Sequence, residues 1–187
     1  MNQAISFVGL PGGGKSTIGR QLAKRLGWQF TDSDSVIEKR IGCSIRIFFE
    51  REGEAEFRNI EGDVIAELCA TTNVVLATGG GVVLREANRQ MLQRLTHAIY
   101  LRSTPEELFR RLRNDTQRPL LQVKDPQARL RELYGERDPL YREVAHFIVD
   151  TGRSSMPSLV NMVLMQLELA GIIDPTAVQS SAEQPRC

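Results

Sequence analysis

Gly9-Leu-Pro-Gly-Gly-Gly-Lys-Ser-Thr17 is a glycine-rich segment that follows a short apolar run at residues 4–8. It fits the phosphate-binding pattern G-x-x-x-x-G-K-[ST], and residues 17–26 after it place apolar side chains about one helical turn apart. Glycines allow several backbone N–H groups to point into one hollow, and a helix start adds unpaired N–H groups and a positive dipole end. The segment therefore predicts a strand, a loop and a helix that together bind a nucleoside triphosphate.

The polar residues of this loop have separate expected roles. Lys15 would bring a positive charge to the β- and γ-phosphates, and Ser16 would offer its hydroxyl to Mg²⁺. A glycine-rich turn that binds nothing is the alternative, but the strand, the spacing, the lysine and the hydroxyl all agree with the pattern. The predicted nucleotide contacts are Gly12, Gly13, Gly14, Lys15, Ser16 and Thr17.

Apolar runs alternate with helical patterns along the rest of the chain. Such alternation is typical of a parallel sheet with helices on both faces. We predict a three-layer αβα fold with a five-stranded parallel sheet in one domain, residues 1–173, and a disordered tail at 174–187. Further strands are expected at 28–31, 73–77, 97–101 and 147–150, and helices at 35–40, 44–51, 54–69, from 105, at 126–144 with an interruption near Gly135 and Pro139, and at 158–169.

Two aspartates follow the second predicted strand. Ser35 and Glu38 fit a capping box, so Ser35 is expected to cap the next helix and leave Asp34 free to face a ligand. The third strand does not end in an acidic residue, and this assigns the metal role to Asp32. The alternative is that both aspartates serve as turn and cap residues.

Three glycines, Gly79, Gly80 and Gly81, follow the third predicted strand. Consecutive glycines at this place suggest a backbone pressed close to a ligand, and a flexible turn is the alternative. Ligands of such sheets sit beyond the carboxyl ends of the strands. The phosphate loop, the two aspartates and these glycines are therefore expected to form one site.

Two arginines have competing interpretations. On sequence spacing, Arg58 is expected to form a surface ion pair with Glu54 or Glu61. Arg118 lies in a polar, irregular stretch at about 113–124, which would suit a mobile lid that delivers an arginine to the transferred phosphoryl group. A solvated loop is the alternative for that stretch.

The overall composition excludes several classes of protein. The formal net charge of the 187 residues is +1, so no global field points to nucleic acid or a membrane. No apolar run approaches the roughly 20 residues of a membrane span. Three cysteines, an odd number without C-x-x-C spacing, favour the reducing cytoplasm, with Cys69 as a core residue. His97 and His146 are interpreted as structural.

The ordered set of motifs resembles the shikimate kinase family over residues 4–170. The resemblance implies the fold of the nucleoside monophosphate kinases and transfer of the ATP γ-phosphate to the 3-hydroxyl of shikimate with Mg²⁺, on the route to chorismate and the aromatic amino acids. The motifs are Gly12-Gly-Gly-Lys-Ser-Thr-Ile-Gly-Arg20, Asp32-Ser-Asp34, Phe57-Arg58, Thr78-Gly-Gly-Gly81, Arg118-Pro-Leu120 and Arg137-Asp-Pro-Leu-Tyr141.

The resemblance also implies a role for each matched residue. The catalytic residues would be Lys15, Asp34 and Arg118. Asp34 would bind the shikimate hydroxyls, and it would either act as the base or only position the hydroxyl. Ser16 would bind Mg²⁺, and Asp32 would support the metal through water. Arg58 and Arg137 would bind the carboxylate, with the Gly79–Gly81 backbone against the ring and residues 33–61 as the acceptor-binding region. Arg111, Arg118 and Arg153 would contact ATP. Leu10-Pro11 and Gly13 depart from the Met-Gly-Ala that relatives often carry, and Pro11 supplies no N–H.

Other functions remain open on sequence alone. A gluconate kinase or a nucleoside monophosphate kinase would share the fold and the phosphate loop. A nucleotide-binding module without catalysis and a catalytically weak paralogue are further alternatives. ATP and shikimate are the expected small-molecule partners, and a monomer without nucleic-acid or membrane contacts is expected.

Overall fold

The computed structural model describes residues 4–112 and 123–174. The expected tail beyond residue 174 and nearly all of the expected lid, including Arg118, lie outside these residues. The elements are β1 (Ala4–Val8), α1 (Lys15–Leu26), β2 (Gln29–Asp32), α2 (Ser33–Ile41), α3 (Ile45–Glu52), α4 (Glu54–Cys69), β3 (Val74–Ala77), a 3₁₀ helix (Val82–Leu84), α5 (Glu86–Leu95), β4 (His97–Arg102), α6 (Pro105–Leu112), α7 (Pro126–Val144), β5 (Phe147–Asp150) and α8 (Met156–Leu169).

The strands form a five-stranded parallel sheet in the order β2-β3-β1-β4-β5. The central strand β1 is buried along its whole length, as expected for a parallel strand covered on both faces. Its side chains alternate between the two layers, because Ala4 and Val8 join one core cluster and Ile5 and Phe7 join the other. The predicted fold class is confirmed.

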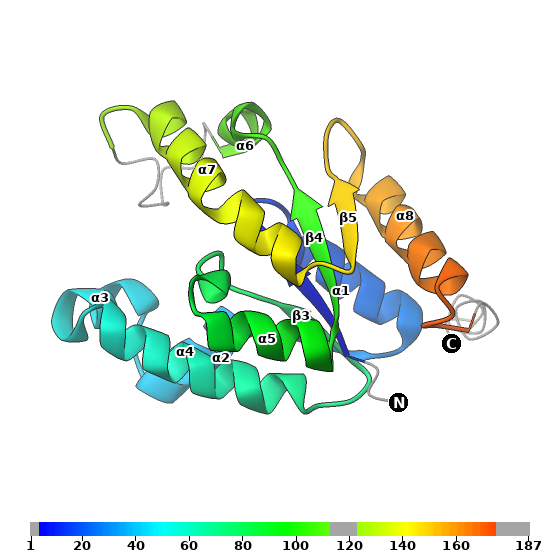
Figure 1. Ribbon diagram of the computed structural model, residues 1–187, viewed down its shortest axis with the longest axis horizontal. Coiled ribbons are helices and arrows are strands. Elements are labelled where there is room, and N and C mark those ends of the chain that lie inside the picture. Colours follow the sequence, from blue (N-terminus) through cyan, green and yellow to red (C-terminus); the bar gives the residue numbers. More distant parts are fainter. Residues whose placement is uncertain (1–3, 113–122, 175–187) are drawn as a thin grey trace, which may run out of the picture.

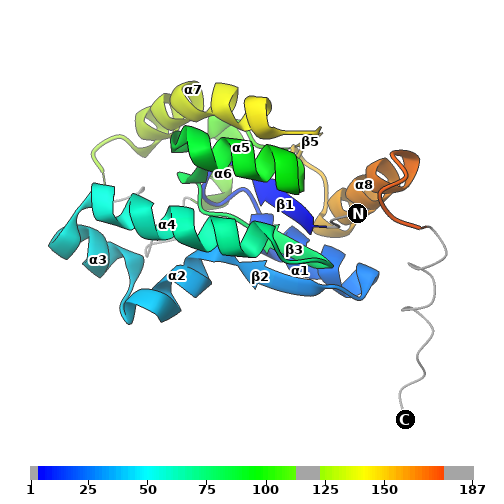
Figure 2. The same ribbon diagram turned by 60° about the horizontal axis from the view of Figure 1, so that its bottom comes forward.

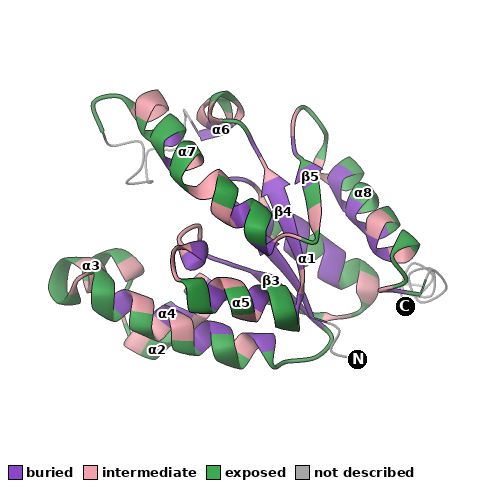
Figure 3. Ribbon diagram, in the orientation of Figure 1, coloured by how far each residue is buried: buried purple, intermediate pink, exposed green. Residues whose placement is uncertain are grey.

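Helices cover both faces of the sheet (Figures 1 and 2). Buried residues of α4, α5, α6 and α7 pack in the cluster that contains Ala4 and Val8, whereas α1 and α8 pack in the cluster that contains Ile5 and Phe7. The buried residues lie in the strands and on the helix faces turned toward them (Figure 3). Cys69 belongs to the first cluster, which confirms its interpretation as a core residue.

Helices α2, α3 and α4 extend beyond one side of the sheet with a small core of their own (Figure 2). Ile37, Phe57 and Val64 are its buried members, and half-buried residues such as Phe48 and Phe49 pack on them. This small core fixes the part of α4 that carries Arg58 beside α2, which carries Asp34.

Two local predictions were wrong. Asp32, not Ser35, caps α2, because its side chain accepts hydrogen bonds from the backbone N–H groups of Asp34 and Ser35. Helix α7 runs without interruption from Pro126 to Val144 with Pro139 inside it. The residue four positions before this proline is Gly135, which has no side chain and is exposed, so solvent can satisfy the backbone carbonyl that lacks a helical donor.

Candidate active site

The phosphate loop joins β1 to α1 as predicted. Gly14 caps α1 with a φ of 91°, a left-handed conformation that side chains other than glycine adopt with strain. The carbonyl of Gly14 accepts the first helical bond from Ile18 N at 2.9 Å. The N-terminal N–H groups of α1 therefore face the mouth of the loop, where a phosphate group can accept from them.

Lys15 is buried beneath this loop. Its Nζ donates to the carbonyl oxygens of Gly9 at 2.8 Å and Leu10 at 2.9 Å. These bonds hold the ammonium group at the base of the hollow, where its charge complements a phosphate.

Asp32 at the end of β2 has two functions at once. Its Oδ1 caps α2, and its Oδ2 accepts a hydrogen bond from the Ser16 hydroxyl at 2.6 Å. A hydroxyl and a carboxylate oxygen thus lie together at the start of α1. Both are hard oxygen donors of the type that Mg²⁺ prefers, and the described residues contain no cluster of three or more acidic, His or Cys ligands. This donor set suits Mg²⁺ held largely by phosphate oxygens and water.

Asp34 lies two residues further, in the first turn of α2. Burial above all, together with the nearby charges of Asp32 and Glu61 and against the charge of Lys15, raises the pKa of its carboxyl from 3.8 to about 6. A carboxylate with a pKa near neutrality is suited to accept a proton at physiological pH.

The three glycines after β3 lie directly against the candidate site residues. A Cβ atom on Gly79 would come within 2.7 Å of Asp34 Oδ1, and one on Gly81 within 2.6 Å of Arg58 Nη1. A Cβ atom on Gly80 would lie 2.7 Å from Pro11 Cδ. This loop can therefore lie against Asp34, Arg58 and the phosphate loop at the same time only because its glycines carry no side chains.

Arg58 on α4 is held by two glutamates. Its guanidinium contacts Glu61 at 2.8 Å and Glu54 at 3.1 Å, so both predicted partners are present. The predicted surface location holds for Glu54, whose side chain is 61% exposed, but it is wrong for the pair with Glu61, because the side chains of Arg58 and Glu61 are only 12% and 1% exposed. Burial raises the pKa of Glu61, and the positive charge of Arg58 lowers this pKa by less. The pair orients Arg58 beside Gly81.

Arg137 on α7 has an unusual polar atom. Its Nε is buried and has no hydrogen-bond partner in residues 4–112 and 123–174. The neighbouring Asp138 is fixed by Tyr100 at 2.8 Å and by Arg142 at 2.7 Å, which anchors this turn of the helix to β4. Because an unpaired buried donor is costly, the Arg137 guanidinium is suited to an external acceptor such as a carboxylate.

A cleft of about 460 Å³ unites most of these groups. Its lining comprises the phosphate loop, the two aspartates, the glycines after β3, and residues from α6 and α8. The lining residues are Pro11, Gly12, Gly14, Lys15, Ser16, Thr17, Asp32, Asp34, Thr78, Gly79, Gly80, Arg111, Leu112 and Met156.

Known proteins identify the family of this chain. The family model described as shikimate kinase matches residues 11–168. This chain belongs to the shikimate kinase family. A shikimate kinase of Ralstonia nicotianae is 53% identical over 180 residues, which are 96% of this chain and 95% of that protein. A shikimate kinase of Paracidovorax citrulli is 58% identical, with 92% and 96% covered.

Solved structures agree with the family. Shikimate kinase from Acinetobacter baumannii in complex with shikimate superimposes with a TM-score of 0.85 at 42% identity, over 93% of this chain and 97% of that one. A gluconokinase from Sinorhizobium meliloti reaches a TM-score of 0.57 at 16% identity, with 91% and 95% covered, and so shares the fold alone. Of these two structures, only the shikimate kinase resembles this chain in sequence as well as in fold.

The site residues that the resemblance to shikimate kinase predicted do not all line the cleft. Gly13 is a buried residue of the phosphate loop whose N–H donates to the Leu10 carbonyl at 3.2 Å, and it lies outside the cleft lining. Arg58, Gly81 and Arg137 also lie outside the lining, although Gly81 adjoins Arg58. Arg111 lines the cleft and donates to the Gly152 carbonyl at 2.9 Å, whereas Arg153 is exposed in the loop after β5 and does not line it.

Sequence reasoning missed several lining residues. Thr78 donates to the Phe7 carbonyl at 2.8 Å and ties the glycine loop to β1; its position just before the glycines was the available signal. Leu112 and Met156 carried no such signal, because apolar residues on helices are normally interpreted as core residues.

His146 accepts a hydrogen bond from Ala98 N, in agreement with its structural interpretation.

None of the helices in the described part of the chain is long and apolar enough to cross a membrane.

Proposed function

We propose that this chain transfers the γ-phosphoryl group of ATP to the 3-hydroxyl of shikimate, giving shikimate 3-phosphate and ADP for the synthesis of chorismate and aromatic amino acids. The observation that carries the proposal is the position of Asp34 in one cleft with the phosphate loop, with a pKa of about 6. Membership in the shikimate kinase family supports the acceptor.

The phosphate loop positions the nucleotide. The backbone of Gly12 and Gly14 and the first turn of α1, including Thr17, donate to the phosphates, and Lys15 neutralises charge that builds up on the transferred group. Gly13 contributes to the nucleotide site by shaping the loop, since its N–H is bonded to the Leu10 carbonyl at 3.2 Å. Positioning and charge stabilisation account for most of the rate in phosphoryl transfer, so a rigid, buried lysine is well suited to this task.

Asp34 activates the acceptor. As the shikimate oxygen forms its bond to phosphorus and the bond to ADP breaks, the hydroxyl proton passes to the Asp34 carboxylate. The neighbouring Gly79 allows the carboxylate to lie against the backbone, where the acceptor ring can approach it.

Arg58 and Arg137 bind the shikimate carboxylate. They come from α4 and α7, and both helices reach the glycine loop Gly79–Gly81, because Arg58 adjoins Gly81 and Tyr141 of α7 bonds the Gly80 carbonyl. Two guanidinium forks match one carboxylate. The unpaired Nε of Arg137 supports this role, since a bound carboxylate supplies its missing acceptor.

Ser16 and Asp32 would hold Mg²⁺ beside the phosphate loop. Bound there, Mg²⁺ would supply positive charge to neutralise the phosphates of the nucleotide. The hydroxyl and carboxylate oxygens of these two residues already lie 2.6 Å apart at the start of α1, and this closeness supports the assignment.

The remaining assignments concern the nucleotide and the protein as a whole. Arg111 and Arg153 flank the nucleotide from the ends of α6 and β5, and Arg118 reaches the phosphates from a lid at 113–124. The chain acts as a cytoplasmic monomer on its two small substrates. Its low net charge supports the absence of nucleic-acid and membrane partners.

Replacing Arg137 by alanine is expected to raise the KM for shikimate by about 10- to 100-fold with a smaller change in kcat, because the lost contact to the carboxylate acts before and during transfer. Steady-state kinetics with varied shikimate measure this. Arg131→Ala is the matched control, since Arg131 is an exposed arginine of the same helix that pairs with Glu106. An unchanged KM in Arg137→Ala would remove this residue from the carboxylate site.

The acid limb of the pH profile is expected to follow Asp34. Its raised pKa of about 6 means that the carboxyl is protonated below that pH and can no longer accept the hydroxyl proton. We therefore expect kcat/KM for shikimate to fall about tenfold per pH unit below about pH 6. Rates measured from pH 5 to 8 test this, and a profile that stays flat down to pH 5 would contradict the role of Asp34 as base.

The proposed function is tested by ADP release in a coupled assay with ATP. Shikimate, gluconate, AMP and no acceptor are compared, each with and without Mg²⁺. We expect stimulation by shikimate alone, and only with Mg²⁺. Stimulation by gluconate or AMP in place of shikimate would overturn the acceptor assignment, and the same rate without any acceptor would favour a nucleotide-binding module.

A further inference from the structure

The glycine loop after β3 needs contacts from outside to keep its shape. A peptide between two glycines can reverse its orientation at little cost, because neither residue has a Cβ atom. The carbonyl oxygens of Gly79 and Gly81 are bound by Val82 N at 3.1 Å and Leu84 N at 3.0 Å in the turn that follows. Those two bonds leave the orientation of the central carbonyl, that of Gly80, undetermined.

The Gly80 carbonyl is held by Tyr141. The Tyr141 hydroxyl donates to this oxygen at 2.6 Å, and no other hydrogen bond to it occurs in the described part of the chain. Because the peptide unit is planar and trans, the N–H of Gly81 points in the opposite direction from this oxygen, away from Tyr141. The hydroxyl of Tyr141 thereby determines where an N–H group next to Arg58 points.

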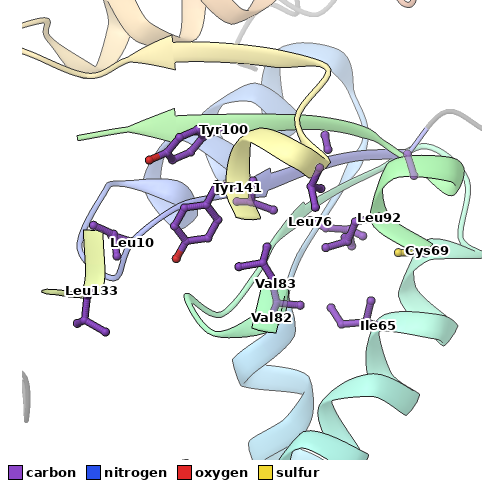
Figure 4. Close-up of a cluster of buried hydrophobic side chains, with 14 of the residues drawn as sticks. Leu10, Ile65, Cys69, Leu76, Val82, Val83, Leu92, Tyr100, Leu133 and Tyr141 are labelled. Atoms are coloured by element: carbon purple, nitrogen blue, oxygen red, sulfur yellow. The ribbon is translucent and has the colours of Figure 1, made fainter. Parts of the chain in front are cut away.

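Tyr141 is a dependable donor. Its ring is fully buried and stacks on Tyr100 with centroids 5.0 Å apart. Burial raises the pKa of the phenol, and the charge of Arg137 and a hydrogen bond between the two side chains lower it by less, so the hydroxyl keeps its proton at physiological pH. Figure 4 shows the Tyr141 hydroxyl turned toward the segment that enters Val82 and Val83, while that of Tyr100 points elsewhere.

Tyr141 also links two parts of the acceptor site. It lies one turn after Arg137 on α7, so the helix that carries one carboxylate-binding arginine also fixes the loop beside the other. We propose that Tyr141 is a positioning residue for the acceptor, which holds the Gly80–Gly81 peptide in the single orientation that suits the shikimate carboxylate. This inference rests on the proposed function, because shikimate is its ligand.

Tyr141→Phe removes the hydroxyl and keeps the ring. We expect the KM for shikimate to rise about tenfold, the size expected when a buried carbonyl loses its hydrogen-bond partner, with the KM for ATP within about twofold of the wild type. Thr96→Val is the control, since it removes a buried hydroxyl that contacts Ser6 and the Leu92 carbonyl instead of the glycine loop. We expect no comparable shift in shikimate KM there. An unchanged KM in Tyr141→Phe, or an equal rise in both variants, would overturn the inference.

A second measurement needs no substrate. The backbone ¹H–¹⁵N signal of Gly81 reports on its peptide unit, so we expect it to move or split in Tyr141→Phe and to keep its position in Thr96→Val. An unchanged signal in Tyr141→Phe would overturn the inference. By contrast, a wild-type protein without shikimate-stimulated ADP release would overturn the proposed function, whatever the signal of Gly81 does.

Discussion

Replacing Asp34 by asparagine is expected to lower kcat with shikimate by at least about 10²-fold, the range of a lost general base. The side chain keeps its size and its place beside Gly79 but can no longer accept the hydroxyl proton. ATP binding is expected to stay near normal, because the nucleotide contacts come from the phosphate loop and α1. Single-turnover rates with saturating ATP and shikimate measure the effect.

The same substitution is expected to stabilise the folded chain at pH 8. The pKa of Asp34 is raised from 3.8 to about 6 on folding, so the folded state binds the proton more tightly than the unfolded state. The contribution of this carboxyl to stability is therefore fully present below about pH 4 and is lost as the pH rises through about 6. At pH 8 the buried charge costs about 2–3 kcal/mol, which asparagine avoids.

Urea unfolding at pH 8 and pH 4 tests the predicted change in the stability of Asp34→Asn. Asp34→Asn is expected to be more stable than the wild type at pH 8 and equally stable at pH 4. Asp63→Asn is the control, because Asp63 is an exposed aspartate on α4 and should change neither activity nor the pH dependence. Normal turnover in Asp34→Asn would remove Asp34 from the chemistry, and equal stability at pH 8 would show that its burial carries no such cost.

Gly79→Ala is expected to lower kcat/KM for shikimate by about 10²-fold, the loss that follows from displacing a catalytic group by about 1 Å. The added methyl group would lie 2.7 Å from Asp34 Oδ1, nearer than van der Waals contact permits, so the carboxylate must move. The loop itself tolerates the backbone change, because Gly79 has no positive φ. The substitution should therefore displace the Asp34 carboxylate while the protein stays folded.

Gly62→Ala is the matched control for this experiment. Gly62 lies inside α4, and a methyl group there would meet only Asn88 Oδ1, at 3.5 Å. We expect this variant to keep its activity and to gain about 0.5–1 kcal/mol of stability, since alanine favours the helix. Wild-type kcat/KM in Gly79→Ala, with its fold confirmed, would show that Asp34 does not need the position it has in this structure.

Several elements could be predicted because their cause is local. The phosphate loop, the helix over residues 54–69 and the strand over residues 147–150 were placed within a residue or two from glycine spacing and apolar periodicity. Helix α5 and the 3₁₀ helix before it were not predicted. The cap of α2 was misplaced, because Ser35 matched a capping box while Asp32 stood one residue before the first helical turn.

The interior of the site depended on contacts between distant segments. Arg58 has glutamates at helical spacing, so a surface pair was the natural expectation, and only the packing of α4 against its neighbouring helices buries Glu61. Three further contacts of the site join segments that lie apart in the sequence, and no local pattern encodes them. Gly81 lies next to Arg58, Pro11 packs against Gly80 across 69 positions, and the Tyr141 hydroxyl bonds the Gly80 carbonyl across 61 positions.

The sequence by itself determined the fold class, the phosphate loop and the family, because each follows from short-range spacing or from an ordered set of motifs along the chain. The tertiary structure alone decided which charges are buried, and hence the raised pKa of Asp34, the burial of the Arg58–Glu61 pair and the unpaired Nε of Arg137. The physical reason is that desolvation and hydrogen bonding depend on all neighbours in space, and most of those neighbours come from other parts of the chain.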